Sequence, residues 1–499
     1  MNLFYFFSVF IVATCGLIYE LVVGAIASYL LGDSVTQFST VIGTYLFAMG
    51  VGSFLSKFVT KRLVHTFIKV EILIGLFGGF SATILFAMFD HVSSFRTLLY
   101  SVIMIIGILV GVEIPLVMKI LKDRIEFNKL VSHVFSFDYI GALLASLAFP
   151  LILVPYLGLI RTSFLFGMLN VGVALMTLIL FKGETRGSRS LVGFSIISLL
   201  VLTVGFVFSE RITQFTEQMA YNDQVIYSHS THYQRILITK NPHELKLFLN
   251  GNLQFSSRDE YRYHEPLVHT GLASLKDPKK VLILGGGDGL AVREVLKYPS
   301  VEKILLVDLD DKMTQIFKTN DLLTALNQKS LTNPKVEVLN GDAFEWAKST
   351  FEKFDFVIVD FPDPTNFSLG KLYTQKFYAS LASHLTENGL LVVQSTSPFV
   401  ARKSFWCIAE TIQAAGFKTY PYHVYVPSFG EWGFVIASLD KDYKQPESYP
   451  ADLKFVNAKV SDDMFNFPPD MAYLKVDVNK LNNQALVKYF EDEWAHYTH

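Results

Sequence analysis

Four aspartates in the second half of the chain each lie just beyond a short apolar run. They are Asp288, Asp308, Asp342 and Asp360. Runs of this kind are typical of buried parallel strands, whose carboxyl ends meet at one edge of a sheet. We therefore expect four carboxylates to surround one crevice, and such a crevice favours a cationic ligand. A single aspartate in this position is a common helix cap, whereas four at successive strand ends are much less expected by chance.

The first of these aspartates belongs to a glycine-rich turn. Residues 280–308 read KVLILGGGDGLAVREVLKYPSVEKILLVD. Gly285, Gly287 and Asp288 lie in the turn, and Asp308 ends the second apolar run. A strand, a glycine turn, a helix and a second strand ending in an acid form a nucleoside-binding βαβ unit, in which Asp308 can bind both ribose hydroxyls. The spacing is not the dinucleotide form, and an acid in the turn would repel a pyrophosphate. A cationic adenosyl sulfonium is therefore favoured over NAD.

A second acid follows Asp360 in a stiff loop, which reads Asp360-Phe361-Pro362-Asp363-Pro364. An amine can attack the carbon next to a sulfonium only when the amine is neutral. A carboxylate within hydrogen-bond reach must therefore accept its proton. The thioether that leaves is neutral and needs no acid, and positioning of the two substrates supplies most of the remaining acceleration.

A parallel sheet is needed to bring these residues together. The short runs that predict its strands are residues 281–284 and 304–307, which are fully apolar, and 336–339, 354–359 and 390–394. Residues 291–298 have the pattern of a helix between the first two strands. This alternation predicts an α/β domain with a Rossmann-like, mostly parallel sheet.

The first 208 residues have a different composition. They contain seven apolar runs, each sufficient to cross a hydrocarbon core of about 30 Å. These runs are residues 3–31, 36–56, 68–89, 97–118, 135–157, 162–181 and 190–208. The first run is too long for a cleavable signal peptide and has no basic segment before it. The sequence therefore predicts a seven-span helical membrane domain ahead of the α/β domain.

The overall composition excludes several classes of protein. The chain of 499 residues is 51% hydrophobic and 18% charged, with a mean hydropathy of +0.36, which excludes an ordinary soluble enzyme and a disordered chain. A net charge of −2 argues against nucleic acid as the main partner. Cys15 and Cys407 alone provide neither a disulfide framework nor a cysteine metal site. Carboxylates that face a cationic substrate need no metal, so none is predicted.

Basic residues are unevenly distributed between the apolar runs. The loops after the second, fourth and sixth runs hold Lys57, Lys61, Arg62, Lys69, Lys119, Lys122, Arg124, Lys129, Lys182, Arg186 and Arg189. The alternate loops hold only Arg96 and Arg161. The positive-inside rule assigns the larger set to the cytoplasm. Seven crossings would then place the C-terminal half outside, although the substrates of the chemistry above are made inside cells. The sequence leaves the side of the membrane open.

Four carboxylates interrupt the apolar runs. They are Glu20, Glu71, Glu113 and Asp138. They could line a path for a cation or a polyamine, or they could be protonated or hydrogen-bonded groups that fix helix packing. The sequence leaves both interpretations open.

From about residue 221 to residue 438 the chain resembles the spermidine synthase family of polyamine aminopropyltransferases. Together with the apolar runs, it resembles the membrane-fused bacterial branch of that family. The matching strings are YQ (233–234), LNGNLQFSSRDEYRYHE (249–265), GGGDG (285–289), VDLD (307–310), GDA (341–343), DFPDP (360–364), LYTQKFY (372–378), QSTSPF (394–399) and PSFGEWGF (427–434). The resemblance covers a little under half of the chain. It implies a small β-domain over residues 222–255, with strands near 233–239 and 244–249.

The resemblance also implies residue roles. The residues that would hold the adenosyl part of decarboxylated S-adenosylmethionine are Gln234, Asp308, Asp342 and Ala343. Asp308 would bind the ribose hydroxyls and Asp342 the adenine amino group. Asp360 would be the general base, and the residues that would contact amines are His264, Asp288 and Asp363. The aromatic residues that could wall the aliphatic chain are Tyr263, Tyr373 and Trp432, although a core role is slightly more expected for them.

Three departures from the family pattern affect these roles. Asp308 stands where soluble members usually have Glu, and Ala343 stands where they usually have Gly. Residues 365–367 read TNF, in place of the Gly-Pro-rich stretch of soluble enzymes. This last segment lies over the acceptor, so the identity of the amine is the least determined feature.

The sequence and the resemblance together predict a membrane-bound aminopropyltransferase that converts putrescine to spermidine without a prosthetic group. Its co-product would be S-methyl-5'-thioadenosine. The alternatives are an S-adenosylmethionine-dependent methyltransferase, which shares this sheet, and a membrane sensor or transporter that binds polyamine or nucleoside without turnover. Asp288 argues against the first, because the methionine carboxylate would lie near it, and Asp360 with Asp363 argues against the second.

The expected domains are residues 1–208 in the membrane, 209–270 as connector and small β-domain, 271–445 as catalytic domain and 446–499 as a tail. Soluble relatives imply a homodimer.

Overall fold

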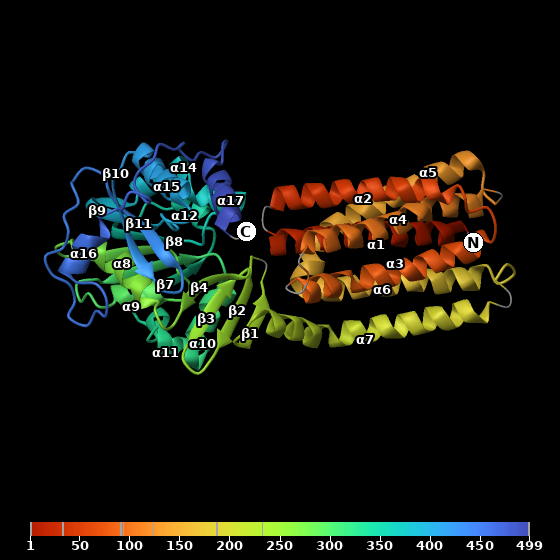
Figure 1. Ribbon diagram of the computed structural model, residues 1–499, viewed down its shortest axis with the longest axis horizontal. Helices are drawn as coiled ribbons and strands as arrows, with labels where there is room; N and C mark the ends of the chain where they lie inside the picture. Colours follow the sequence, from red (N-terminus) through yellow and green to blue (C-terminus); the bar gives the residue numbers. More distant parts are fainter. Residues whose placement is uncertain are drawn as a thin grey trace. The chain divides into compact units, whose positions relative to one another are not determined.

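The computed structural model describes residues 2–497, except residues 32–33, 90–91, 93, 123, 186–187 and 232. Arg186, one of the basic loop residues, therefore lies outside the described residues. The chain separates into two compact units, residues 1–225 and 226–499. Figure 1 shows the first unit as a bundle of long helices and the second as strands covered by shorter helices.

Long apolar helices form the first unit. They are α1 (Asn2–Leu31), α2 (Ser34–Ser56), α3 (Leu63–Met88), α4 (Phe95–Leu121), α5 (Phe127–Ala148), α6 (Val154–Leu180) and α7 (Arg189–Ala220). Six stretches among the described residues are long and apolar enough to cross a membrane. Seven were expected; the fifth and sixth runs merge into Phe127–Leu180, a stretch of 54 residues. A π-helix at Phe149–Leu153 joins α5 to α6 without a polar break, and Gly158, with φ 72°, kinks the stretch.

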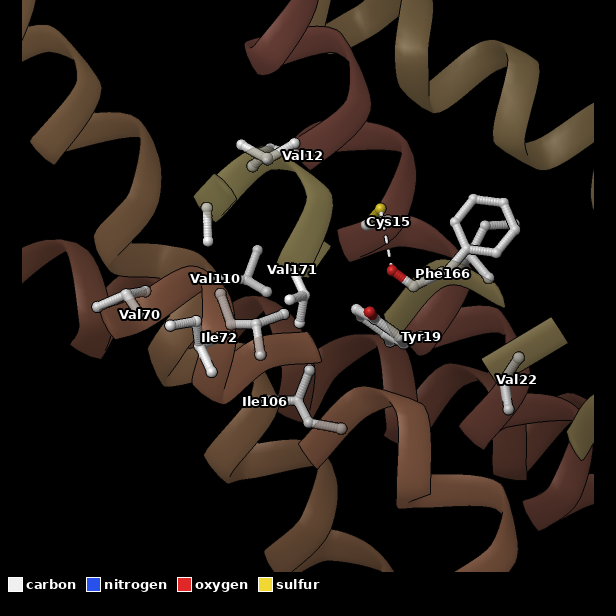
Figure 2. Packing of buried hydrophobic residues seen from close by; sticks show 14 of the residues in the cluster. Val12, Cys15, Tyr19, Val22, Val70, Ile72, Ile106, Val110, Phe166 and Val171 are labelled. Atoms are coloured by element: carbon white, nitrogen blue, oxygen red, sulfur yellow. Dashed lines mark hydrogen bonds between the residues drawn. The ribbon is translucent and has the colours of Figure 1, made fainter. Parts of the chain in front are cut away.

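Apolar side chains from α1, α3, α4 and α6 fill the interior of this bundle. Figure 2 shows Val12, Val70, Ile106 and Val171 gathered there, all at most 8% exposed. The Cys15 thiol lies 3.7 Å from a backbone carbonyl oxygen of α6 and is completely buried. Close packing of this kind leaves the four helices in a fixed arrangement.

Two of the carboxylates in the apolar runs lie in this interior. Glu71 and Glu113 are 0% and 1% exposed. The amide of Asn170 donates to Glu71 Oε2 over 2.8 Å, and the Tyr19 hydroxyl donates to Asn170 Oδ1 over 3.0 Å. This chain of hydrogen bonds joins α1, α3 and α6. For Glu71 it favours the packing role that the sequence left open.

The basic loops gather at one end of the bundle. The contacts that join them are Lys119 with Ser56, Arg124 with Glu184 and His65 with Ser188. Arg161, from one of the other loops, binds Ser209 and Glu210 in the later part of α7. The chain therefore leaves the bundle along α7 at the end opposite to the basic loops (Figure 1).

The second unit begins with a small antiparallel sheet. In this sheet the strands lie side by side in the same order as along the chain. They are β1 (Gln224–Ser230), β2 (Arg235–Lys240), β3 (Leu245–Leu249) and β4 (Asn252–Ser256). β2 and β3 correspond to the two strands expected near 233–239 and 244–249. β4 pairs with β3 through an irregularity between Leu247 and Phe248.

A seven-stranded sheet follows, with the order β10-β11-β9-β8-β5-β6-β7. Its parallel strands are β5 (Lys280–Gly285), β6 (Lys303–Asp308), β7 (Val336–Asn340), β8 (Phe354–Asp360) and β9 (Leu385–Gln394). All five were expected, so the prediction of a mostly parallel Rossmann-like sheet is confirmed. Two antiparallel strands extend it beyond β9: β11 (Gly430–Ser438), and β10 (Lys418–Val426) at the edge. β5 is flanked by β6 and by β8, so the strand order reverses there, which is where such sheets bind ligands.

Helices cover both faces of this sheet, because alternate side chains of its buried strands point to opposite sides. Val281 and Ile283 belong to one apolar core and Leu282 and Leu284 to the other. The first core includes residues of α8 (Tyr261–Leu272), α9 (Leu290–Val295), α10 (Asp311–Thr319), α11 (Asp321–Leu326) and α16 (Ala458–Met464). The second includes residues of α12 (Ala343–Ser349), α14 (Gln375–Ala382), α15 (Arg402–Ala414) and α17 (Ala485–Tyr497).

The C-terminal segment, expected as a tail with little periodicity, packs as part of this unit. Glu493 on α17 accepts hydrogen bonds from the Lys403 and Ser404 amides, at 2.6 and 3.0 Å, in the first turn of α15. Glu265 on α8 accepts three more from the backbone amides of residues 454–456, at 2.7 to 3.0 Å. Both contacts satisfy backbone donors that would otherwise be unpaired.

Candidate active site

The glycine turn after β5 lies between two of the predicted aspartates. Gly285 has φ 84°, and a Cβ atom there would lie 2.2 Å from the backbone oxygen of Asp360. A Cβ atom on Gly287 would lie 2.6 Å from Oδ2 of Asp308. Only glycine permits this backbone shape and these close approaches. The turn therefore brings the ends of β8 and β6 together around it.

Asp308 is held by backbone donors on both sides. Its Oδ2 accepts from the Gly287 amide over 3.0 Å, and its Oδ1 accepts from the Asp310 amide over 2.9 Å. Burial, with the Asp310 and Asp288 carboxylates adding, raises the pKa of Asp308 to about 7. A group that is this costly to ionise gains from hydrogen-bond donors supplied by a ligand, such as the hydroxyls of a sugar.

Gln234 contacts Asp310, two residues beyond Asp308 at the end of β6. Its side-chain amide donates to Oδ2 of Asp310 over 3.0 Å, and the Thr231 hydroxyl donates to the same oxygen over 2.8 Å. Asp310 also caps α10 through the Lys312 amide and is 1% exposed. Asp310 closes the string VDLD but was not predicted as a site residue from the sequence. It connects the small sheet to the end of β6.

Asp342 differs from the other predicted aspartates because it forms an ion pair with a lysine. Its Oδ1 caps α12 by accepting from the Phe344 amide over 2.8 Å, and its Oδ2 lies 2.7 Å from Nζ of Lys371. Against the effect of burial, the Lys371 ammonium and the backbone donors lower the pKa of Asp342. Ala343 is the first residue of the capped helix and is buried. Of the four carboxylates that were expected, Asp342 therefore has its charge balanced by a lysine.

Asp360 ends β8 and accepts a hydrogen bond from Tyr263. The Tyr263 hydroxyl lies 2.5 Å from Oδ1 of Asp360. Burial, with the Asp288 carboxylate adding, raises the pKa of Asp360 to about 6, although His264 and the Tyr263 hydroxyl oppose this rise. The carboxylate is therefore ionised at neutral pH but close enough to its pKa to exchange a proton.

Asp363 lies in the same loop and is held by residues from the end of β9. The Gln394 amide and the Thr396 hydroxyl donate to it over 3.4 and 3.3 Å. Burial raises the pKa of Asp363 to about 7, although these two bonds oppose the rise. Thr396 has φ 56°, which is unusual for a β-branched residue and occurs where the surrounding structure imposes it. Neither Gln394 nor Thr396 was singled out from the sequence.

The aromatic candidates differ in position. The Tyr373 hydroxyl donates to the backbone oxygens of Phe361 and Pro362, and its ring is completely buried. Its contacts are those of a residue that shapes the loop. Trp432 lies near Tyr263, with ring centroids 6.4 Å apart, and its indole N–H is a buried donor with no partner among the described residues.

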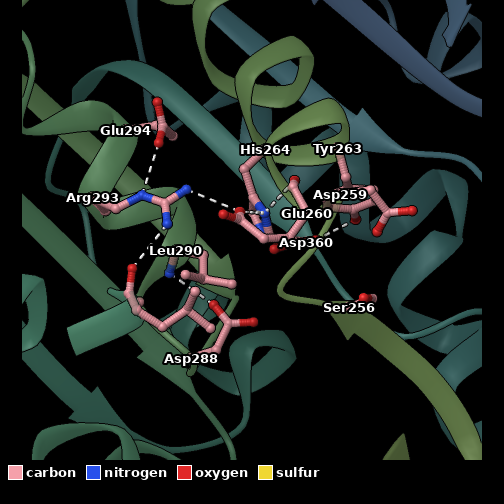
Figure 3. A network of polar contacts seen from close by, with 12 residues as sticks. Ser256, Asp259, Glu260, Tyr263, His264, Asp288, Leu290, Arg293, Glu294 and Asp360 are labelled. Carbon is pink, nitrogen blue, oxygen red and sulfur yellow. Dashed lines mark hydrogen bonds and ion pairs between the residues drawn. The ribbon is translucent and has the colours of Figure 1, made fainter. Parts of the chain in front are cut away.

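Behind the carboxylates lies a buried network of ion pairs (Figure 3). Nδ1 of His264 lies 2.9 Å from Oε2 of Glu260, which also pairs with Arg293 over 2.9 Å. Burial opposes a charge on His264, but Glu260 and the Asp288 and Asp360 carboxylates raise the pKa of His264 to about 9. His264 is therefore an imidazolium at neutral pH. Glu260 and Arg293 were not identified from the sequence.

Asp288 faces this imidazolium from the glycine turn. Its Oδ1 accepts from the Leu290 amide over 2.8 Å, and only 8% of the residue is exposed. Burial raises the pKa of Asp288, although His264 and the Leu290 amide oppose this rise. The site thus contains several carboxylates that can attract a cation. The positive charge of His264 reduces the repulsion between these carboxylates.

Comparisons with known proteins identify the family of the chain. Residues 260–448 match the family model described as the spermine/spermidine synthase domain. A protein of Leptospira interrogans named polyamine aminopropyltransferase is 52% identical over 492 residues, which are 98% of this chain and 98% of that protein. Polyamine aminopropyltransferase 2 of Ralstonia nicotianae is 50% identical over 495 residues, covering 98% of this chain and 97% of that protein.

Among solved structures, a spermidine synthase in complex with the transition state analogue AdoDATO is 30% identical, with a TM-score of 0.46. It covers 49% of this chain, and the match includes 85% of that protein. The curated relatives, by contrast, match the helical unit as well as the α/β unit. On the strength of these full-length relatives, the chain belongs to the polyamine aminopropyltransferase family and is a transferase.

Proposed function

We propose that the protein transfers the aminopropyl group of decarboxylated S-adenosylmethionine to putrescine, which gives spermidine and S-methyl-5'-thioadenosine. The observation that carries this proposal is the half-buried Asp360, which is hydrogen-bonded to Tyr263 and whose pKa is raised to about 6. Such a carboxylate attracts an ammonium ion and can then accept its proton, which is the step that makes an amine nucleophilic.

The transfer itself needs little further chemistry. The lone pair of the neutral amine attacks the carbon next to the sulfonium, the carbon–sulfur bond breaks, and its electron pair goes to sulfur. The sulfonium becomes a neutral thioether, the attacking nitrogen becomes a secondary ammonium ion, and Asp360 holds the proton that the amine gave up before the attack. Holding the two substrates in line is the remaining task of the site.

The donor would occupy the end of β6. We assign Asp308 to the ribose hydroxyls, and Gln234, Asp342 and Ala343 to the adenosyl group. Gly285 and Gly287 give the donor access to the backbone of the turn. Because Lys371 already binds Asp342, contact with the adenine amino group requires the two to share this carboxylate.

The acceptor would lie between Asp360 and Asp363. We assign Asp363 to the distal amine of putrescine, Asp288 to the amine groups near the reacting carbon, and Trp432 to the wall around the aliphatic chain. His264 lies beside these amines and, as an imidazolium, would balance the charges of Asp288 and Asp360. Asp288 also favours the decarboxylated donor, because the carboxylate of intact S-adenosylmethionine would approach a buried acid.

We further propose that residues 1–208 hold the protein in the cell membrane as a multi-pass anchor, which the six apolar stretches support. Residues 209–270 would form the connector and small β-domain, 271–445 the catalytic domain and 446–499 its C-terminal extension. The homodimer implied by soluble relatives stays a prediction, which light scattering of the purified chain in detergent checks.

The decisive experiment incubates the purified full-length chain with either decarboxylated or intact S-adenosylmethionine and a panel of amines. Methylthioadenosine and new polyamines are measured. The expected result is putrescine-dependent formation of both products from the decarboxylated donor alone. Methyl transfer from the intact donor would support the methyltransferase instead, and binding without product would support a sensor.

A further inference from the structure

A cleft of about 680 Å³ opens where α6 ends and α7 begins. Its wall is apolar and includes Leu175, Leu178, Ile179 and Val192, and its rim includes Lys182 and Arg189. Ile179 is 65% exposed although it is a large apolar residue. The cleft therefore combines an apolar surface with two positive charges at one end of it.

The two cations have no counterion in the part of the chain that the structure describes. No carboxylate there lies within ion-pair distance of Lys182 or Arg189, although Arg124 in the neighbouring basic loop is paired with Glu184 in the same turn. The rim is also fixed in place, because Ser188, next to Arg189, lies 2.8 Å from Nε2 of His65 on α3. Two unpaired charges are thus held at the mouth of an apolar cleft.

The position of the cleft narrows the choice of ligand. It lies at the end of the bundle where the basic loops gather, which is the end that faces an anionic lipid surface under the positive-inside rule. A polyamine would be repelled by Lys182 and Arg189. A free inorganic anion would make no contact with the apolar wall. An amphipathic anion satisfies both parts of the cleft.

We propose that this cleft binds an anionic phospholipid, with the phosphate between Lys182 and Arg189 and an acyl chain along Leu175, Ile179 and Val192. The lipid would occupy the junction of α6 with α7, the helix that continues towards the catalytic unit. This inference depends on the proposed membrane location and is independent of the proposed aminopropyl transfer.

Native mass spectrometry of the full-length chain in detergent tests the site, with phosphatidylglycerol and phosphatidylcholine as the probes. Each basic residue near an anionic lipid contributes about a fivefold gain in affinity, so Lys182→Gln with Arg189→Gln should weaken phosphatidylglycerol binding roughly 30-fold. Phosphatidylcholine binding should change little. The matched control, Lys61→Gln with Lys122→Gln, removes the same charge from the basic loops outside the cleft and should bind like the parent.

Three results would overturn the proposal: no preference of the parent for the anionic lipid, equal losses in both double variants, or displacement of the lipid by inorganic phosphate alone. A second variant, Ile179→Gln, tests the apolar wall and should also weaken phosphatidylglycerol binding; unchanged binding would reject an acyl-chain contact. Aminopropyl transfer is measured on the same samples. Retained transfer with lost lipid selectivity separates failure of this site from failure of the enzyme assignment.

Discussion

The Tyr263 hydroxyl donates a hydrogen bond of 2.5 Å to Oδ1 of Asp360, and this contact joins α8 to the end of β8. Three aromatic rings hold Tyr263 in place, those of Phe429, Trp432 and Phe434, at centroid distances of 6.2, 6.4 and 5.2 Å. The protonation of the proposed general base thus depends on a side chain outside the sheet.

Replacing Tyr263 with Phe should change the pH dependence of the reaction. Asp360 must be ionised to accept a proton, so kcat/KM of the parent should begin to rise with pH near 6 and should level off only above about 7, where Asp308 and Asp363 are ionised as well. The hydrogen bond from Tyr263 lowers the pKa of Asp360, so its loss should move this rise to higher pH. Initial rates measured from pH 5 to 9 would show the shift.

A matched variant separates this effect from a general loss of packing. Tyr378→Phe also removes a buried hydroxyl, but that hydroxyl has no hydrogen-bond partner among the described residues. Its pH profile should follow that of the parent. A Tyr263→Phe profile that still rises near pH 6 would show that the contact does not tune Asp360.

Asp360→Asn should abolish most turnover while preserving nucleoside binding. Asn keeps the size of the side chain and an oxygen for Tyr263, but it cannot take a proton from the amine. A loss of about 10²–10⁴ in kcat is expected for removal of a general base. Calorimetry with methylthioadenosine should give an affinity close to that of the parent. Loss of binding together with loss of turnover would assign Asp360 a structural role.

Glu260→Gln should remove a pH-dependent part of the stability. The pKa of His264 is about 9 in the folded chain and 6.5 as a model value, so between these pH values only the folded state holds the proton. The stabilisation, of the order of 3 kcal/mol, is therefore complete below pH 6.5 and is lost as the pH rises towards 9. The melting temperature of the parent should fall across this window.

In Glu260→Gln this fall should be much smaller, because the carboxylate that raises the pKa of His264 is gone. Glu387 is exposed, so Glu387→Gln removes a carboxylate without touching the network and should melt like the parent at each pH. An equal fall in Glu260→Gln and the parent would show that His264 is not the titrating group.

The sequence predicted features that depend on neighbouring residues along the chain. The run 354–359 is apolar except for Asp355, so it predicts a buried strand, and the glycine-rich composition around Gly285 predicts a turn. Contacts between distant segments left no such signal: Gln234 binds Asp310 across 76 positions, and Lys371 is separated from Asp342 by 29. Neither pairing has a local pattern, and both depend on how the sheet is assembled.

The same limit applies at the edges of the catalytic unit. β10 and β11 are antiparallel to their neighbours, and only the completed sheet order reveals them. Glu493 could not be recognised as a cap of α15, because it lies 89 positions from Ser404. In the membrane half the apolar runs were clear, but the continuous passage from α5 to α6 contains no polar residue that would mark its boundary.

Lys371→Met should tighten nucleoside binding slightly. Lys371 and Asp342 form an ion pair in which both side chains are 34% exposed, and the proposed adenine contact needs the same carboxylate. Half-exposed pairs contribute at most about 1 kcal/mol, so a gain below about fivefold in methylthioadenosine affinity is expected by calorimetry. Lys348→Met breaks a pair with Glu345 on α12, the helix that Asp342 caps, and should not change the affinity. Weaker binding in Lys371→Met would instead make Lys371 a ligand of the nucleoside.

Single cysteines can locate the two ends of the helical bundle. The native Cys15 and Cys407 are buried, so reagent should reach only introduced thiols. Lys61 belongs to the basic loops, Ser94 to the loop between α3 and α4, and Arg211 to the later part of α7; all three are exposed. The positive-inside rule places Lys61 in the cytoplasm. The apolar part of α7, Arg189–Ile212, is 24 residues long and is sufficient to cross a bilayer.

In intact cells a membrane-impermeant maleimide should therefore label Ser94→Cys and Arg211→Cys but not Lys61→Cys, and inverted vesicles should give the opposite pattern. Because Arg211 lies at the end of the last apolar stretch, its labelling would place the α/β unit that follows away from the cytoplasm, and the substrates would have to reach it there. Protection of Arg211→Cys together with Lys61→Cys would mean that one apolar stretch does not cross. Phe127–Leu180, which is kinked at Gly158, would then be the stretch to test next, by cysteines placed along its length.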